Sequence, residues 1–108
     1  MMRSISPQEF EKGLYSQTKP VLLAYLRRDA AYQLQVLEEV CREIGDRIDV
    51  YLLDADCLSS FWERHGFKGT PTFMISRGGQ KQSMLLGRTN AQTLNRFILD
   101  YLNSRKDS

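Results

Sequence analysis

An apolar run followed by an amphipathic segment constrains the fold of this chain more than any other feature. Val21 to Leu26 is continuously apolar and of strand length, as is typical of a central strand covered by helices on both faces. Residues 30–44 then have the period of a helix, and Ile48 to Leu53 is predicted to be a second buried strand. The apolar stripe of the helix comprises Leu34, Leu37, Cys41 and Ile44, widened by Val36 and Val40. Because strands joined by a helix favour parallel pairing through a right-handed crossover, these segments predict an α/β sheet.

Local signals predict two further helices in the first two thirds of the chain. Ser6-Pro7-Gln8-Glu9 combines a capping serine, a proline at the first helical position and a glutamate that completes a capping box. The helix that starts there is predicted to run to about Ser16. A short helix is predicted over residues 58–65, between the second buried strand and a turn bracketed by Gly66 and Gly69.

The last third of the chain is predicted to form a hairpin and a helix. Arg77-Gly-Gly-Gln80 is flanked by strands over residues 72–76 and 81–86, as in a hairpin with a tight turn. Asn90 caps the final helix. Its apolar stripe comprises Leu94, Phe97, Ile98, Tyr101 and Leu102. The predicted order α-β-α-β-α-β-β-α gives a mixed sheet with helices on both faces.

Length and charge bound the classes of function. The 108 residues suit one domain, 1–108, with an ordered core expected over 6–102 and a frayed polar tail over 103–108. A net charge of +2, evenly spread, does not favour a nucleic-acid surface. No apolar run approaches the roughly 20 residues that cross a bilayer, and the start of the chain has no apolar signal segment. We therefore expect a cytoplasmic protein.

The chain has two cysteines and one histidine, too few for a structural zinc site, so we expect no metal and no other cofactor. Cys41 lies on the stripe of the second helix and is predicted to behave as a small apolar residue. Cys57 follows Asp54-Ala-Asp56 at a strand end. It is either a surface thiol without a role or a monothiol with regulatory or catalytic chemistry.

Two segments and two glycines carry a resemblance to the thioredoxin family. Val50-Tyr-Leu-Leu-Asp-Ala-Asp56 resembles the family's second core strand, and Arg64-His-Gly-Phe-Lys-Gly-Thr-Pro-Thr-Phe73 resembles the turn into its proline strand. Gly79 and Gly87 fall at the family's hairpin glycine and at the glycine that faces its active site. The resemblance covers about residues 20–102 and implies a thioredoxin-like three-layer sandwich, with Pro71 as the cis-proline.

The chain departs from the family where the chemistry would be. Arg27-Arg-Asp-Ala-Ala-Tyr-Gln33 stands where the family has its Cys-x-x-Cys, in a segment a few residues shorter than the family pattern. Ala24 replaces the family's buried acid. Disulfide exchange needs one thiolate to attack and a second thiol to resolve the mixed disulfide. These departures from the family imply that the domain has no catalytic residues and no longer carries out dithiol exchange.

The first hypothesis is a redox-inactive binding or chaperone-like module whose partner is another protein or an extended peptide. In the family, the backbone at the position of Thr70 meets an extended peptide, which predicts β-type hydrogen bonds here. The arginines of the loop are either a partner-binding edge for acidic groups or part of a solvated turn. Tyr32 is either an exposed contact aromatic or packs on Leu86. The predicted binding residues are Arg27, Arg28, Asp29, Tyr32, Thr70, Pro71, Gly87 and Arg88.

Two alternatives stay open at this point. One is an enzyme that uses Cys57 alone, with glutathione as the thiol partner. The other is a structural subunit without a ligand, which an exposed apolar patch on the hairpin or the last helix would favour.

Overall fold

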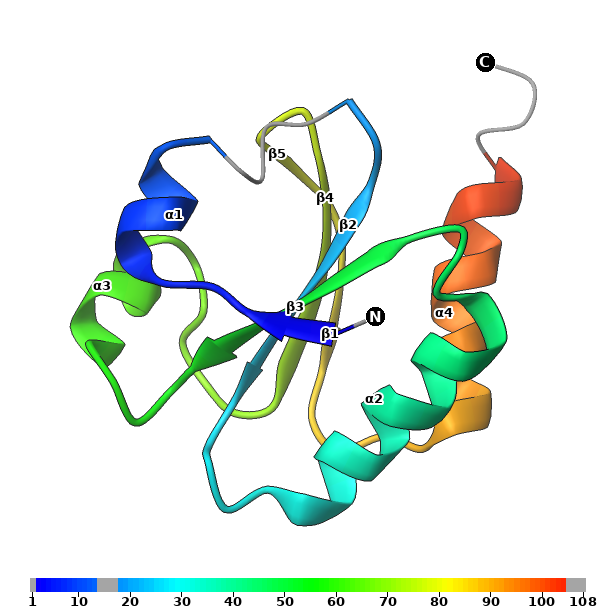
Figure 1. Cartoon of the computed structure of the whole chain (residues 1–108), viewed down its shortest axis with the longest axis horizontal. Helices are drawn as coiled ribbons and strands as arrows, with labels where there is room; N and C mark the ends of the chain where they lie inside the picture. Colours follow the sequence, from blue (N-terminus) through cyan, green and yellow to red (C-terminus); the bar gives the residue numbers. More distant parts are fainter. Residues whose placement is uncertain (1, 14–17, 105–108) are drawn as a thin grey trace.

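The computed structural model describes residues 2–13 and 18–104 and shows a five-stranded mixed sheet in the order β1-β3-β2-β4-β5 (Figure 1). The three strands β1, β3 and β2 run parallel to one another. The strand β4 is antiparallel to β2, and β5 is antiparallel to β4. The strands are β1 Met2–Ser4, β2 Val21–Leu26, β3 Asp49–Asp54, β4 Thr72–Arg77 and β5 Gln80–Leu86.

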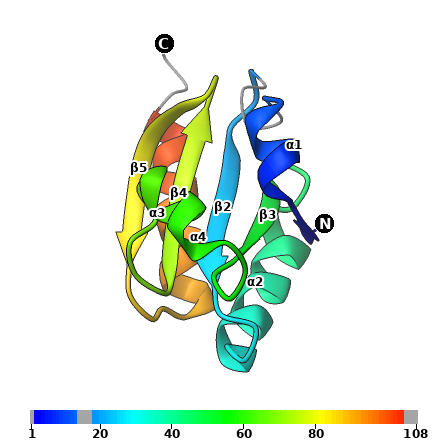
Figure 2. The same ribbon diagram turned by 90° about the vertical axis from the view of Figure 1, so that its left-hand side faces the viewer.

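Helices cover both faces of this sheet, and the predicted α/β three-layer arrangement is confirmed. Figures 1 and 2 show α1 and α3 on one face, with α2 and α4 on the other. The helices are α1 Pro7–Glu11, α2 Ala31–Ile44, α3 Ser59–Arg64 and α4 Ala91–Ser104. Among the residues described, no helix combines the length and the apolar character needed to cross a membrane.

The strand β2 explains why two helix layers are needed. Its side chains alternate between the two faces, and all six of its residues are buried. Leu22, Ala24 and Leu26 belong to the core under α2 and α4, whereas Val21, Leu23 and Tyr25 belong to the core under α1 and α3. Burying a leucine or valine side chain contributes about 1.5–3 kcal/mol, so both helix layers stabilise the same central strand.

The caps and the hairpin turn follow the sequence prediction. The capping box at Ser6 is present, with Ser6 and Glu9 bonded reciprocally. Asn90 accepts from the backbone N–H of Thr93 through its Oδ1 atom at 2.8 Å. Gly78 and Gly79, between β4 and β5, have φ values of 61° and 80°. A two-residue hairpin loop with positive φ at both positions strongly favours glycine.

The start of the chain differs from the prediction. The strand β1 is not among the strands predicted from the sequence. Met2–Ser4 pairs in parallel with β3, so the sheet includes residues before residue 6, where the ordered core was expected to begin. Three residues are too few to reveal a period of two in the sequence. The helix α1 ends at Glu11, short of the predicted Ser16, and a turn follows that contains Gly13 with a φ of 91°. Residues 14–16 of the predicted helix lie outside the described part of the chain.

The buried faces of α2 and α4 are narrower than the predicted stripes. In α2 the buried apolar residues are Val36, Leu37, Val40 and Ile44, whereas Leu34 and Cys41 are only partly buried. The stripe that meets the sheet is therefore rotated toward Val36 and Val40. In α4 the buried residues are Leu94, Ile98 and Tyr101. This helix continues through Ser104, so residues 103 and 104 belong to it, and residues 105–108 lie outside the described part.

Candidate functional site

A groove of about 260 Å³ lies where three loops meet the first turn of α2. It collects residues from the loop after β2, from the loop before β4 and from the loop after β5. Six of the eight predicted binding residues line it, while Arg28 and Gly87 do not. The lining residues are Leu26, Arg27, Asp29, Ala30, Ala31, Tyr32, Gln33, Thr70, Pro71 and Arg88.

The strand register brings these loops together. Tyr25, near the end of β2, lies opposite Thr72, the first residue of β4. Thr72 in turn lies opposite Leu86, the last residue of β5. The loop after β2, the entry to β4 and the exit from β5 therefore meet at one end of the sheet.

The Pro71 loop has a defined internal geometry. The Thr70–Pro71 peptide bond is cis. The Thr72 hydroxyl donates to the carbonyl of Gly69 at 2.6 Å, and the backbone N–H of Gly87 donates to the carbonyl of Pro71 at 2.9 Å. Gly87 has a φ of 92°, a value that favours glycine, and it contacts the Pro71 loop through this backbone hydrogen bond.

Thr70 is exposed at the edge of the groove. Its backbone N–H and C=O make no hydrogen bond to any residue within 2–13 or 18–104. An exposed backbone amide outside the sheet can form β-type hydrogen bonds with an extended segment.

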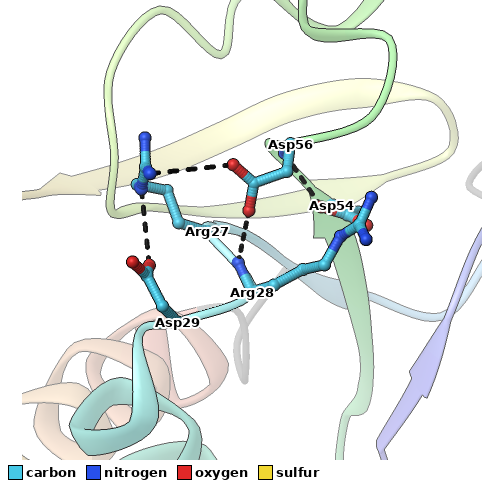
Figure 3. Close-up of polar contacts among 5 residues, drawn as sticks. All are labelled: Arg27, Arg28, Asp29, Asp54 and Asp56. Atoms are coloured by element: carbon cyan, nitrogen blue, oxygen red, sulfur yellow. Dashed lines mark hydrogen bonds and ion pairs between the residues drawn. The ribbon is translucent and has the colours of Figure 1, made fainter.

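The two arginines of the loop after β2 are both paired with carboxylates (Figure 3). Arg27 contacts Asp29 at 3.4 Å and Asp56 at 3.9 Å. The Nε of Arg28 donates to Oδ2 of Asp54 at 2.9 Å. Arg28 thereby lies against the end of β3, in a neighbouring hollow of about 200 Å³ that Asp54 also lines, and not in the groove. Arg28 does not line the groove, because β3 is the parallel neighbour of β2 and ends in a carboxylate within reach of this arginine.

Tyr32 and Leu86 are both exposed, at 51% and 69% respectively. Tyr32 stands on the first turn of α2 and lines the groove. Of the two interpretations of this residue, the exposure favours the contact aromatic over packing on Leu86.

Gln33 is a groove residue that the sequence prediction missed. It is 4% exposed although it is polar. Its Nε2 donates to the carbonyl of Thr89 at 3.0 Å, and its Oε1 accepts from the backbone N–H of Thr89 at 3.2 Å. The sequence did contain a signal for this burial. Gln33 lies three positions before Val36 and four before Leu37, which places it on the same helix face as these two buried residues.

The two cysteines are free and neither lines the groove. Cys41 is partly buried on α2, and burial, reinforced by the charge of Glu38, raises the pKa of its thiol. Cys57 is exposed, and its backbone N–H donates to the carbonyl of Asp54 at 3.1 Å. In the described part of the chain no three His, Cys, Asp or Glu side chains are grouped to hold a metal ion.

Known proteins match this chain over most of its length. Residues 1–100 match the family described as Thioredoxin. Thioredoxin Y, chloroplastic, from Oryza sativa subsp. japonica is 30% identical over 74 residues, which is 66% of this chain and 44% of that protein. Thioredoxin Y1, chloroplastic, from Arabidopsis thaliana is 27% identical over 86% of this chain and 56% of its own length. The chain thus spans about half the length of these two relatives.

A cyanobacterial relative aligns nearly end to end. Thioredoxin from Synechocystis sp. (strain ATCC 27184 / PCC 6803 / Kazusa) is 24% identical over 101 residues, which is 91% of this chain and 94% of that protein.

Proposed function

This chain belongs to the thioredoxin family, and from that premise we propose that it is a redox-inactive binding module. In this proposal the groove at Pro71 holds an extended segment of another protein. The backbone of Thr70 carries the proposal, because it offers a donor and an acceptor that have no partner in the described part of the chain, beside a groove of about 260 Å³. Apolar Ala30, Ala31 and Pro71, none of which is buried, supply surface for the side chains of the segment.

The residues at the groove support binding without thiol chemistry. Ala30 is the N-cap of α2 and Ala31 is its first residue, and the chain has no cysteine between Arg27 and Gln33. Dithiol exchange requires a thiolate and a second thiol. A helix start favours the thiolate, because the helix dipole lowers the thiol pKa there. We therefore expect no acceleration of insulin disulfide reduction when the chain is supplied with NADPH and a thioredoxin reductase. Sustained NADPH oxidation would contradict this proposal.

Peptide selection tests the binding function directly. A phage-displayed library of random heptapeptides is panned against the full chain, and selected peptides are measured by fluorescence anisotropy. We expect binding to persist in the double variant Cys41→Ser, Cys57→Ser, because neither thiol lines the groove. Thr70→Pro removes the backbone N–H and should abolish binding, whereas the control Thr70→Ser keeps both backbone groups. Binding that survives Thr70→Pro would contradict this role of the loop.

A second candidate function is monothiol chemistry at Cys57, with glutathione as co-substrate. It is favoured by the exposure of this thiol. The thiolate of Cys57 would attack glutathione disulfide, forming a mixed disulfide and releasing one glutathione thiolate. Titration of the Cys57 thiol in Cys41→Ser tests this function. A pKa near the free value of about 8.5 would exclude an activated thiol.

A further inference from the structure

The loop after β5 is anchored on both sides of Arg88. On one side, the backbone N–H of Gly87 donates to the carbonyl of Pro71 at 2.9 Å. On the other side, the side-chain amide of Gln33 pairs with both backbone groups of Thr89, at 3.0 and 3.2 Å. Gln33 is buried, and the two hydrogen bonds are part-buried. The backbone position of Arg88 is therefore set by the Pro71 loop and by α2 together.

The guanidinium of Arg88 has no partner within the described residues. It is exposed and lines the groove. Among residues 2–13 and 18–104 it makes no hydrogen bond, ion pair or contact with an aromatic ring. The arginines of the loop after β2 differ in this respect, because Arg27 is paired with Asp29 and Asp56, and Arg28 with Asp54. The three carboxylates near the groove, those of Asp29, Asp54 and Asp56, are thus already paired with other arginines.

The remaining lining of the groove contains no second unmatched charge. Its charged residues are Arg27, Asp29 and Arg88, and the first two form an ion pair. The other lining residues are apolar or uncharged, with Leu26, Ala31 and Pro71 among them. An arginine whose backbone is anchored beside a groove is suited to a carboxylate, which its guanidinium can bind through two parallel hydrogen bonds.

We propose that Arg88 determines the specificity of the groove and selects an extended segment that carries an aspartate or glutamate side chain. Gln33 is the positioning residue, since it fixes the loop on which Arg88 stands. This inference rests on the proposed binding function and adds the chemical class of the bound segment. Thr70 and Arg88 line the same groove, so one segment can bond to the Thr70 backbone and present its carboxylate to Arg88.

Panning of the heptapeptide library against three charge variants tests this assignment. The control is Arg96→Gln, which removes an exposed arginine of α4 outside the groove. The intact chain and Arg96→Gln should enrich aspartate or glutamate at one position of the selected peptides. Arg88→Gln should lose that enrichment. Arg88→Glu should enrich lysine or arginine at the same position instead.

Affinities measured for matched peptides make the test quantitative. One selected peptide is synthesised with its carboxylate side chain and with the corresponding amide. The intact chain should prefer the acid roughly two- to fivefold, as expected of an exposed ion pair, and the preference should shrink at high salt. Arg88→Gln should bind both peptides equally.

The positioning role of Gln33 has its own readout. Gln33→Leu keeps the side-chain volume and removes both bonds to Thr89. It should reduce the acid-over-amide ratio while the affinity for the amide peptide is retained, a pattern that general loss of structure would not produce. The exposed Arg88 variants test the proposal even where Gln33→Leu does not fold.

The outcomes separate this inference from the proposed function. Peptides that are enriched without an acidic bias, or an acidic bias that persists in Arg88→Glu, would overturn the role of Arg88 while the groove still binds peptides. If the intact chain enriches no peptide, the binding function fails and the role of Arg88 falls with it.

Discussion

The backbone N–H of Arg28 donates a hydrogen bond of 2.7 Å to Oδ2 of Asp56. This contact joins the loop after β2 to the loop after β3. It is reinforced by the backbone N–H of Ala55, which donates to the carbonyl of Leu26 at 2.8 Å. Figure 3 shows the two loops side by side with their charged groups interleaved. Two neighbouring parallel strands therefore end in one connected rim beside the groove.

Removing the acceptor in this contact should destabilise the rim. Asp56→Ala is expected to lower the free energy of unfolding by about 1 kcal/mol, because a charge-assisted hydrogen bond is lost at an exposed site. Urea denaturation followed by circular dichroism measures the change. The control is Asp29→Ala, whose ion pair spans 3.4 Å with the carboxylate side chain 77% exposed, and its effect should stay below about 0.5 kcal/mol. Equal losses in the two variants would count against the connected rim.

The core under α2 and α4 should respond strongly to truncation. Leu37→Ala is expected to cost about 2–5 kcal/mol of unfolding free energy, because Leu37 is fully buried and the substitution leaves a cavity. Leu86→Ala serves as the control, since that leucine is largely exposed. Its stability in urea should differ from that of the unsubstituted chain by no more than about 0.5 kcal/mol. A small effect of Leu37→Ala would mean that α2 packs elsewhere.

The capping box of α1 predicts a pH dependence of stability. The backbone N–H of Ser6 donates to Oε1 of Glu9, and this bond, together with the nearby Arg3, lowers the pKa of Glu9 below its ordinary value of 4.5. Because the folded-state pKa lies below the unfolded one, the carboxylate stabilises the fold above about pH 4.5. That contribution is lost as the pH falls through the folded-state pKa.

Comparison of Glu9→Gln with the unsubstituted chain measures this contribution. The variant should be less stable at pH 7, and the difference should shrink in acid, where the glutamate itself is protonated. Thermal unfolding over a series of pH values gives the two stability curves. Glu11→Gln, on the same helix, is the control for a change of charge without the capping contact. A stability difference independent of pH would argue against the role of the Glu9 carboxylate.

The two thiols should differ in reactivity toward an aromatic disulfide reagent. Cys57 is exposed and should react quickly in the native protein. Cys41 should react more slowly, because it is partly buried and burial raises the pKa of its thiol, leaving less thiolate. The fast phase should disappear in Cys57→Ser and persist in Cys41→Ser. Two equally fast phases in the unsubstituted chain would contradict this placement.

Much of the fold could be predicted because its signals are local. The apolar run of β2, the helical period of α2 and the glycine pair of the hairpin each depend on neighbouring residues. The capping contact between Ser6 and Glu9 spans three positions. Where the signal was weak the prediction was wrong, as with β1, whose three residues belong to the sheet only through their pairing with β3.

The candidate site also has a part that could be predicted from the sequence and a part that could not. Most residues of the groove could be named from the sequence, because the Pro71 segment resembles the family and the resemblance places the loop after β2 beside it. The pairing of Gln33 with Thr89 and that of Arg28 with Asp54 could not be predicted. These contacts join residues 56 and 26 positions apart. Their geometry depends on how the strands and helices are assembled.

By itself, the amino-acid order determined most of the strands and helices, though not β1, and that no cysteine stands at the start of α2. The tertiary structure alone decided which arginine lines the groove with no partner among the described residues, and which two are matched to carboxylates. The physical reason is that periodicity and capping depend on residues within a turn or two of each other. A charge, in contrast, is satisfied by whatever group the folded chain brings within a few ångströms.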